Sequence, residues 1–314
     1  MKILVTGGAG FIGSHIAQRC AAEGHEVTVL DNMRTGNRTN LQGVECDIVE
    51  GSVEDWATVR ALAEDTELIY HLAALVSVPE SMENPESAER INVLGTVNVL
   101  EAARATGARV VLSSTSAVYG DTGRERHSEE HLPEPASPYA ISKLAAEHYC
   151  HMYRIQYGVP SAIFRYFNVY GPRQDPASPY AAAIAIFSRQ ARKGRPITIF
   201  GTGAQTRDFV YVDDVVEANR LAVQAPPGVY NVGTGERITI TRVAETIREA
   251  AESRSPIRYE DKRPGDVMHS CSDPSRLRSL GWEPQVTLLE GLRRTLAWEA
   301  AQTAGATPLP PPAG

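Results

Sequence analysis

The beginning of the chain constrains the fold more strongly than any other segment. The apolar run Lys2–Val5 leads into the sequence GGAGFIG at Gly7–Gly13, and a helical pattern then extends from Phe11 to Glu23. Glycines between a strand and a helix permit a tight turn and close packing of the helix on the strand. We call Gly7–Gly13 the glycine turn. It predicts the first strand, turn and helix of a parallel sheet.

The same alternation continues through the first half of the chain. Strand patterns occur at Glu26–Leu30, Leu68–Leu72 and Arg109–Ser113, and a helical pattern extends from Asn92 to Ala105. Continuously apolar strands separated by helices are typical of parallel sheets that are covered on both faces. We therefore predict an α/β fold, a Rossmann-type doubly wound parallel sheet with a smaller, interleaved substrate-binding lobe.

The expected domain limits follow from where this pattern changes. Residues 1–165 are expected to form the nucleotide-binding domain, with residues 211–234 returning to it. Residues 166–210 and 235–300 contain more loops and are assigned to the substrate-binding lobe. Residues 301–314 contain the proline-rich stretch Thr307–Ala313, and we expect a disordered tail there.

Composition narrows the class of protein. The formal net charge of -7 argues against binding of nucleic acid or of an anionic membrane surface. No apolar run approaches the roughly 18 residues of a membrane span. The chain enters a strand directly after Met1, and its widely spaced cysteines predict free thiols in the cytoplasm. These cysteines are Cys20, Cys46, Cys150 and Cys271.

The glycine turn also predicts a ligand. Backbone amides and the amino end of a helix bind a pyrophosphate, and Asp31 follows at about the 20-residue offset of an acid that binds the adenosine ribose. This pattern favours NAD over NADP. The alternatives are a glycine turn without a ligand, and a 2′-phosphate that binds Arg34 or Arg38.

A second motif carries groups that can transfer a proton. Tyr139 and Lys143 share one face of a helix that begins near Pro138. A tyrosine of pKa about 10 is a poor base, but an ammonium and a positive nicotinamide ring both favour the phenolate. The pair can therefore accept a hydroxyl proton. An ordinary amphipathic helix is the alternative interpretation.

Further hydroxyls follow another strand. Ser113, Ser114, Thr115 and Ser116 come at the carboxyl end of a strand, where open parallel sheets bind ligands. A hydroxyl there can relay a proton, and it can equally cap a helix.

Together these segments resemble the extended short-chain dehydrogenase/reductases and, within them, the NAD-dependent UDP-sugar 4-epimerases. The resemblance extends from Met1 to about Trp298, through TGGAGFIGSH, HLAALVSVPES, STSAVYGD, SPYAISK, RYFNVYGPRQDP and GAQTRDFVYVDD. It implies that Tyr139 is the catalytic base and that Thr115 occupies the catalytic Ser/Thr position. It also implies that Lys143 binds the nicotinamide ribose and lowers the pKa of the tyrosine.

The resemblance implies two further sets of residues. The expected NAD-binding residues are Gly7, Gly10, Phe11, Ile12, Gly13, Asp31, Asn32, Ser52, Val53, Leu72, Ala73, Ala74, Ser113, Tyr139, Lys143 and Tyr166. The expected substrate-binding residues are Ser77, Thr115, Ser116, Tyr139, Asn168, Arg207, Arg263, Asp266 and Ser270.

At the Ser52 position the family usually carries an acid that accepts from the adenine amino group, and a serine oxygen accepts less strongly. The resemblance places Asn168, Arg207 and Arg263 at the diphosphate, where a planar guanidinium can bind two oxygens. Exposed surface charges are the alternative for these arginines.

The segment after Thr115 bears on the reaction. Relatives that dehydrate or decarboxylate the sugar usually carry an acid there, whereas this chain reads Ser116-Ala117-Val118-Tyr119. The reaction implied is reversible oxidation at C4. Tyr139 takes the hydroxyl proton, NAD takes the hydride, and the 4-keto sugar takes the hydride back on its opposite face.

The preferred sugar is predicted from a small side chain. Ser270 aligns with a position where a tyrosine restricts related epimerases to glucose and galactose, and Gly171–Pro176 resembles the N-acetylhexosamine branch. We predict interconversion of UDP-GlcNAc and UDP-GalNAc, with UDP-glucose and UDP-galactose as a second pair. The neighbouring His269 is expected to line the pocket, and no metal is expected.

Three other inferences concern partners and rival functions. The resemblance implies a homodimer through the Tyr139 helix and the Asn92–Ala105 helix. A UDP-uronate 4-epimerase or another sugar-nucleotide oxidoreductase of the family is the first rival. The second is a non-catalytic, NAD-sensing regulatory protein, which could dispense with Tyr139 and Lys143.

Overall fold

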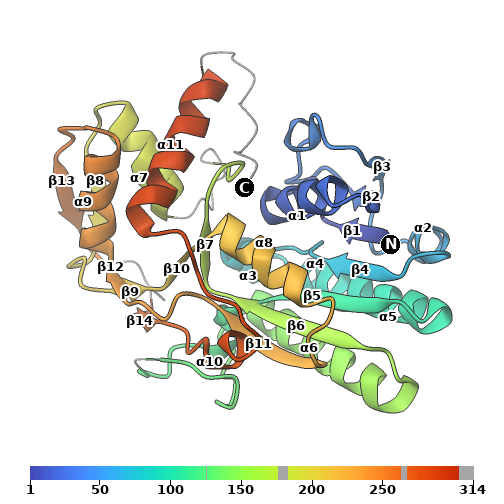
Figure 1. The fold of residues 1–314 in the computed structure, drawn as a ribbon. Coiled ribbons are helices and arrows are strands. Elements are labelled where there is room, and N and C mark those ends of the chain that lie inside the picture. Colours follow the sequence, from blue (N-terminus) through green and yellow to red (C-terminus); the bar gives the residue numbers. More distant parts are fainter. Residues whose placement is uncertain (125, 176–182, 263–266, 304–314) are drawn as a thin grey trace.

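A seven-stranded parallel sheet forms the centre of the computed structural model, which describes residues 1–124, 126–175, 183–262 and 267–303 (Figure 1). The strand order is β11-β6-β5-β4-β1-β2-β3. The strands are β1 (Lys2–Thr6), β2 (Glu26–Asp31), β3 (Asp47–Glu50), β4 (Leu68–His71), β5 (Arg109–Thr115), β6 (Ser161–Tyr166) and β11 (Gly228–Val232).

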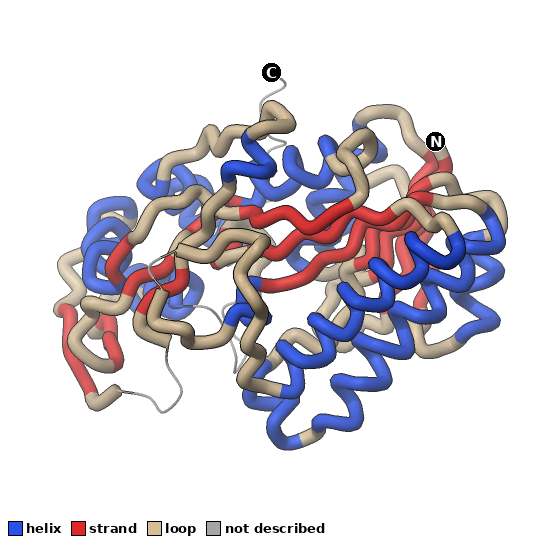
Figure 2. Tube along the Cα trace, turned by 90° about the horizontal axis from the view of Figure 1, so that it is seen from below, coloured by secondary structure: helices blue, strands red, loops and turns tan. Residues whose placement is uncertain are grey.

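Helices cover both faces of this sheet. Alternate strand residues bury on opposite sides: Ile3 and Val5 pack with α1 (Phe11–Ala22) and α8 (Val212–Leu221), whereas Leu4 packs with the helices of the other face. Those helices are α2 (Trp56–Ala63), α5 (Gly95–Thr106) and α6 (Pro138–Tyr157). In Figure 2 the long helices α5 and α6 lie side by side. The predicted doubly wound, Rossmann-type fold is confirmed.

A second lobe, at the left of Figure 1, is built from three small sheets and three helices with their own apolar core. One sheet pairs β7 (Asn168–Tyr170) with β10 (Phe209–Tyr211), and another pairs β8 (Ile197–Phe200) with β13 (Ile257–Glu260). The third has the order β12-β9-β14, which are Ile238–Thr239, Thr206–Arg207 and His269–Ser270. The helices are α7 (Ala183–Arg192), α9 (Ile240–Ala250) and α11 (Leu288–Thr303).

Short helical segments complete the described chain. The loops that follow β2, β4 and β5 each contain at least one of them. They are η1 (Arg38–Leu41), α3 (Val78–Glu83), α4 (Pro85–Ala88), η2 (Glu89–Leu94), η3 (Ser116–Tyr119) and α10 (Ser275–Arg278). Of these, η2 is a π-helical turn that leads directly into α5.

The two lobes are interleaved along the chain. After passing through β7, β8, β9 and β10 of the second lobe, the chain returns through α8 and places β11 beside β6. We keep residues 1–165 with 211–234, and 166–210 with 235–300, as proposed domains. α11 extends to Thr303, so residues 301–303 of the expected tail are helical, and residues 304–314 lie outside the described residues. Among the described helices, none is both long and apolar enough to cross a membrane.

Candidate active site

The glycine turn connects β1 to α1 at the carboxyl edge of the sheet. Gly7 has φ +69°, and a Cβ there would lie 2.7 Å from the backbone nitrogen of Ala73. Gly10 is the N-cap of α1, and within the described part of the chain no side chain caps this helix. The first amides of α1 therefore lack helical partners and can bind an anion. This geometry fits a pyrophosphate.

Asp31 lies beside the glycine turn at the end of β2. Its Oδ2 accepts from the Ala9 amide at 2.9 Å, and its Oδ1 accepts from the Met33 amide at 2.9 Å. A carboxylate oxygen has capacity for more than one hydrogen bond, so each can still accept from a ribose hydroxyl.

The two arginines considered for a 2′-phosphate have partners in the structure. Arg34 forms an ion pair with Glu80, and Arg38 pairs with Glu50 at 3.1 Å. Both partners are carboxylates, which reduce the positive charge offered to a 2′-phosphate. This arrangement favours NAD.

A buried hydrogen-bond chain begins behind the glycine turn. Thr6 Oγ1 lies 2.7 Å from His71 Nδ1, and His71 Nε2 lies 3.0 Å from Thr96 Oγ1. The Thr96 hydroxyl donates to the Asn92 carbonyl at 2.6 Å. Because that hydroxyl has one proton, its oxygen accepts from His71 Nε2–H. Burial, followed by the charge of Lys143, lowers the pKa of His71 to about 3, so the ring is neutral and its Nδ1 accepts from the Thr6 hydroxyl.

This series of hydrogen bonds continues from the π-helical turn η2 to α6, the helix of Tyr139. The Asn92 amide group donates to the Leu75 carbonyl at 3.1 Å and to Ser142 Oγ at 2.9 Å, and it accepts from the Leu75 amide at 2.7 Å. Ser142 in turn donates to the Tyr139 carbonyl at 2.9 Å. We call the series Thr6, His71, Thr96, Asn92 and Ser142 the neutral chain. It links the glycine turn to the first turn of α6.

Local sequence sets the start of α6. Ser137 is the N-cap and accepts from the Ala140 amide at 3.2 Å, and Pro138 occupies the first turn. Both features are typical helix starts. The phenol of Tyr139 is hydrogen-bonded to Thr115, at the end of β5. The structure thus brings two of the three predicted catalytic residues into contact.

The pKa shifts differ in part from the expectation. Burial raises the pKa of the Tyr139 phenol, and the Thr115 hydrogen bond opposes that rise without overcoming it. Removal of the phenol from water outweighs the group that favours its anion, and the expected lowering of this pKa by Lys143 and a positive nicotinamide ring stays a prediction. Lys143 is itself 3% exposed, and burial lowers its pKa to about 8, while Glu147 acts to raise it.

The hydroxyls around Thr115 have separate partners. Ser113 bonds the Tyr166 phenol, and Ser114 donates to Glu147 Oε1 at 2.5 Å. Ser116 begins η3, whose N-cap is Thr115. Of these hydroxyls, that of Thr115 reaches Tyr139.

A buried ion pair lies one helical turn beyond Lys143. Arg165 Nη2 donates to Glu147 Oε2 at 2.6 Å, and both residues are 4% exposed. The Arg165 guanidinium also lies 4.8 Å from the ring centre of Tyr119. Sequence reasoning missed this pair, although Arg165 is the first residue of RYFN and Glu147 follows SPYAISK by four positions.

Several other residues predicted to bind NAD or substrate lie near the glycine turn and α6. The Leu72 amide donates to the Thr6 carbonyl, and the Ala73 amide reaches Thr6 Oγ1 at 3.3 Å. Ser77 caps α3. Tyr166 is 6% exposed and its phenol is hydrogen-bonded to Asn219 at 3.0 Å, so its side chain packs in the core. Its expected contact with nicotinamide stays a prediction.

The second lobe brings three predicted substrate residues together around Asp208. Both the Asn168 amide and its side-chain Nδ2 donate to the Asp208 carbonyl, at 2.9 and 3.2 Å. Arg207 and Ser270 are paired residues of β9 and β14. Arg263 and Asp266 lie outside the described residues.

Asp208 itself was not predicted. Its carboxylate is fully buried and accepts from Thr234 N and Oγ1 at 2.7 Å, from Gly235 N at 3.0 Å, and from Ser272 N and Oγ at 3.0 and 2.5 Å. We call this arrangement the Asp208 cluster. The only sequence signal was its place in QTRDF.

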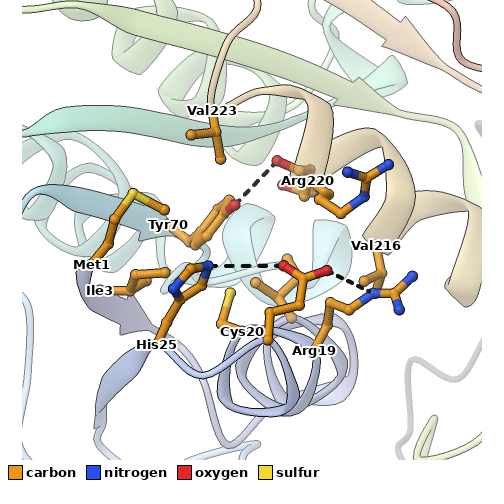
Figure 3. A pocket seen from close by; sticks show the side chains of 12 residues that line it. Met1, Ile3, Arg19, Cys20, His25, Tyr70, Val216, Arg220 and Val223 are labelled. Carbon is orange, nitrogen blue, oxygen red and sulfur yellow. Dashed lines mark hydrogen bonds and ion pairs between the residues drawn. The ribbon is translucent and has the colours of Figure 1, made fainter.

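Two other features lie apart from these groups. His269 Nδ1 lies 2.9 Å from Thr206 Oγ1, and no group of three or more potential metal ligands occurs among the described residues. Figure 3 shows a pocket at the amino-terminal edge of β1, near Met1, His25 and Tyr70. Ligands of open parallel sheets bind at the opposite edge, so this pocket is separate from the candidate site.

Comparison with known proteins agrees with this geometry. The model of the NAD dependent epimerase/dehydratase family matches residues 3–233. The UDP-glucose 4-epimerase of Mycolicibacterium smegmatis is 41% identical over 307 residues, which covers 94% of this chain and 97% of that protein.

Solved structures give the same result. The UDP-glucose 4-epimerase of Thermotoga maritima, with UDP-glucose, has a TM-score of 0.93 and 37% identity, and covers 96% of this chain and 100% of that chain. The UDP-N-acetylglucosamine 4-epimerase of Methanobrevibacter ruminantium, in complex with UDP-N-acetylmuramic acid, has a TM-score of 0.93 and 37% identity, covering 96% and 98%. The predicted family and its cofactor NAD are confirmed: this chain belongs to the NAD-dependent epimerase/dehydratase family.

Proposed function

We propose that this chain interconverts the C4 epimers of a UDP-hexose. The observation that carries the proposal is the Tyr139–Thr115 hydrogen bond. Tyr139 and buried Lys143 share α6, the helix that the neutral chain joins to the glycine turn. The UDP-sugar 4-epimerases among the similar proteins support it.

The roles of the side chains follow from their contacts. Tyr139 accepts the proton of the C4 hydroxyl, and Thr115, already bonded to the phenol, orders that hydroxyl. Lys143, with a pKa of about 8, carries its proton at neutral pH and stabilises the phenolate. NAD, when bound, supplies the site that accepts and returns the hydride. In the absence of an acid after Thr115, the sugar keeps its other substituents.

For the substrate, we propose UDP-GlcNAc and UDP-GalNAc as the preferred pair, with UDP-glucose and UDP-galactose as the second. Ser270 supports this choice because it is small and lies beside Arg207 in the ladder of β9 and β14. A small side chain leaves room for an acetamido group. One of the similar structures is a UDP-N-acetylglucosamine 4-epimerase.

The test uses the purified protein without added NAD. UDP-GlcNAc, UDP-glucose and UDP-glucuronate are incubated separately, and the C4 epimers are followed by NMR. We expect UDP-GalNAc to form, and Ser270→Tyr to suppress that product while sparing UDP-galactose formation. Turnover of UDP-glucose alone would remove the N-acetyl assignment, and turnover of UDP-glucuronate alone would favour the uronate epimerase. No epimer from any of the three would contradict the reaction.

We also propose a cytoplasmic homodimer. Apolar side chains are exposed on η2 and α6, which pack against each other: Leu94, Ile141 and Tyr149 are 47%, 49% and 37% exposed. Large exposed apolar side chains on adjacent helices favour association. Light scattering after gel filtration measures the mass, and Ile141→Glu is expected to yield a monomer.

The four free cysteines suit a reducing compartment.

A further inference from the structure

The turn after β3 contains the position at which this chain departs from its family. β1, β2 and β3 are neighbours in the sheet, and they end at the glycine turn, at Asp31 and just before Ser52. The Gly51 amide donates to the Asp31 carbonyl at 3.0 Å, which holds the ends of β2 and β3 together. In a dinucleotide whose pyrophosphate lies at β1 and whose ribose lies at β2, the adenine is the next group, and β3 is the next strand of the sheet, so the adenine would lie towards its end.

The hydrogen bonds of Ser52 define what its hydroxyl can offer a ligand. Its Oγ–H donates to Glu54 Oε2 at 3.2 Å, and its oxygen accepts from the Glu54 amide at 3.2 Å. A hydroxyl has one proton and two lone pairs. Glu54 already accepts the Ser52 proton, and one lone pair of the Ser52 oxygen remains, so Ser52 can act towards a ligand only as an acceptor. An acceptor matches the 6-amino group of adenine.

Surrounding contacts hold Glu54 in this orientation. Arg90 Nε donates to Glu54 Oε1 at 2.8 Å. Asn98, on α5, donates to the Val53 carbonyl at 2.9 Å and to the Glu54 carbonyl at 3.2 Å. The turn is thus bound to α5 at its backbone and to η2, which carries Arg90, at its carboxylate.

The other nearby acid has a separate role. Asp55 caps α2, accepting from the Ala57 amide at 3.0 Å and from the Thr58 hydroxyl at 2.6 Å. Its carboxylate faces its own helix, so it does not replace the acid that the family carries at the Ser52 position.

We propose that Ser52 recognises the adenine 6-amino group of NAD as an acceptor, and that the Glu54–Arg90 pair takes up the serine proton to make this possible. A serine whose proton points to a carboxylate thereby replaces the family's acid. The proposal rests on NAD as the cofactor and is independent of which UDP-sugar is used.

The test is a competition between two dinucleotides. Purified protein is incubated with equal concentrations of NAD and nicotinamide hypoxanthine dinucleotide, which carries a carbonyl oxygen in place of the 6-amino group. The dinucleotides retained after gel filtration are measured by mass spectrometry. We expect the wild type to favour NAD about tenfold, the effect of roughly one hydrogen bond.

Variants of the turn sharpen the result. Ser52→Ala should bring the ratio near one, Glu54→Ala should reduce it, and Ser52→Asp should preserve it. Thr58→Ala removes a hydroxyl of the same region that bonds Asp55 instead, and it should leave the ratio unchanged. No preference in the wild type, or an unchanged preference in Ser52→Ala, overturns the proposal.

If Ser52→Ala retains neither dinucleotide, calorimetry measures its affinity for each of them separately. Equal weakening of the two affinities then overturns the proposal, and a selective loss for NAD supports it. None of these measurements uses a sugar, so a failure here is distinct from a failure of the proposed reaction.

Discussion

The two sides of the candidate site are held by different kinds of polar group. On the cofactor side, the neutral chain from Thr6 to Ser142 contains no charged group. Its proton positions can be assigned because each hydroxyl has one proton to donate. On the substrate side, the Asp208 cluster places one buried carboxylate among amide and hydroxyl donors.

This difference matches the structures that each side must organise. The neutral chain joins long helices and strands that already have extensive apolar cores. The Asp208 cluster joins the loop after β11 to the ends of β9 and β14, two strands of two residues that have few backbone hydrogen bonds of their own. A carboxylate accepts stronger hydrogen bonds than a neutral group, so it can hold together short segments that lack enough backbone hydrogen bonds to do so themselves.

The largest expected effect is on the reaction itself. Tyr139→Phe removes the proton acceptor and should reduce kcat by about 1,000-fold, within the range of a lost general base. NMR of the sugar products measures kcat, and absorbance at 260 nm measures bound NAD. NAD should be retained as in the wild type. Turnover near the wild-type rate would remove Tyr139 from its proposed role.

Asp208→Asn tests the Asp208 cluster. The amide has one acceptor oxygen, and its NH₂ group faces N–H and O–H donors, so buried donors lose their partner at about 1–3 kcal/mol each. We expect KM for the UDP-sugar to rise at least about tenfold, with NAD retention little changed. Kinetics and urea unfolding measure these effects.

The matched control for Asp208→Asn is Asp273→Asn. Asp273 is less buried, and its carboxylate bonds Ser275 within its own turn. We expect this variant to keep the wild-type KM. Equal effects of the two substitutions would mean that the Asp208 cluster has no particular role in substrate binding.

His71→Gln tests the neutral chain. We expect this variant to lose about 2 kcal/mol of unfolding free energy and to retain NAD more weakly. The pKa of His71 is about 3 in the folded protein, below its ordinary value of 6.5. Between these values the unfolded chain binds more protons, so His71 lowers wild-type stability as pH falls from 6.5 towards 3.

The stability difference between wild type and His71→Gln should therefore shrink over this pH range. Urea unfolding at several pH values measures it. His15, whose pKa is also about 3, is common to both proteins and cancels in the difference. A difference that is constant with pH would mean that His71 is not held neutral.

The smallest expected effect concerns Lys143. Its ammonium is lost as pH rises through about 8, so kcat/KM should fall there. Glu147 acts to raise this pKa, and Glu147→Gln should move the basic limb to lower pH, by about one unit. The control is Glu101→Gln, which removes the charge of the carboxylate on α5 that accepts from Tyr153 of α6. An equal shift in both variants would contradict the assignment to Lys143.

Much of the cofactor side could be predicted from local patterns. The glycine turn, Asp31 and the Tyr139–Lys143 spacing each depend on backbone geometry over a few residues, or on the end of one strand. Side chains that act through distant partners left weaker signals. Thr6 and His71 are separated by 65 positions, and Asp208 and Ser272 by 64.

The sequence by itself therefore determined the fold class, the family and the motifs that meet the cofactor and the reacting hydroxyl. Tertiary structure alone decided which hydroxyl reaches Tyr139, in which direction its pKa shifts, and that Glu147 pairs with Arg165. The physical reason is that pKa values and buried polar pairs depend on desolvation and on neighbours from other strands. Those neighbours become adjacent only when the sheet has formed.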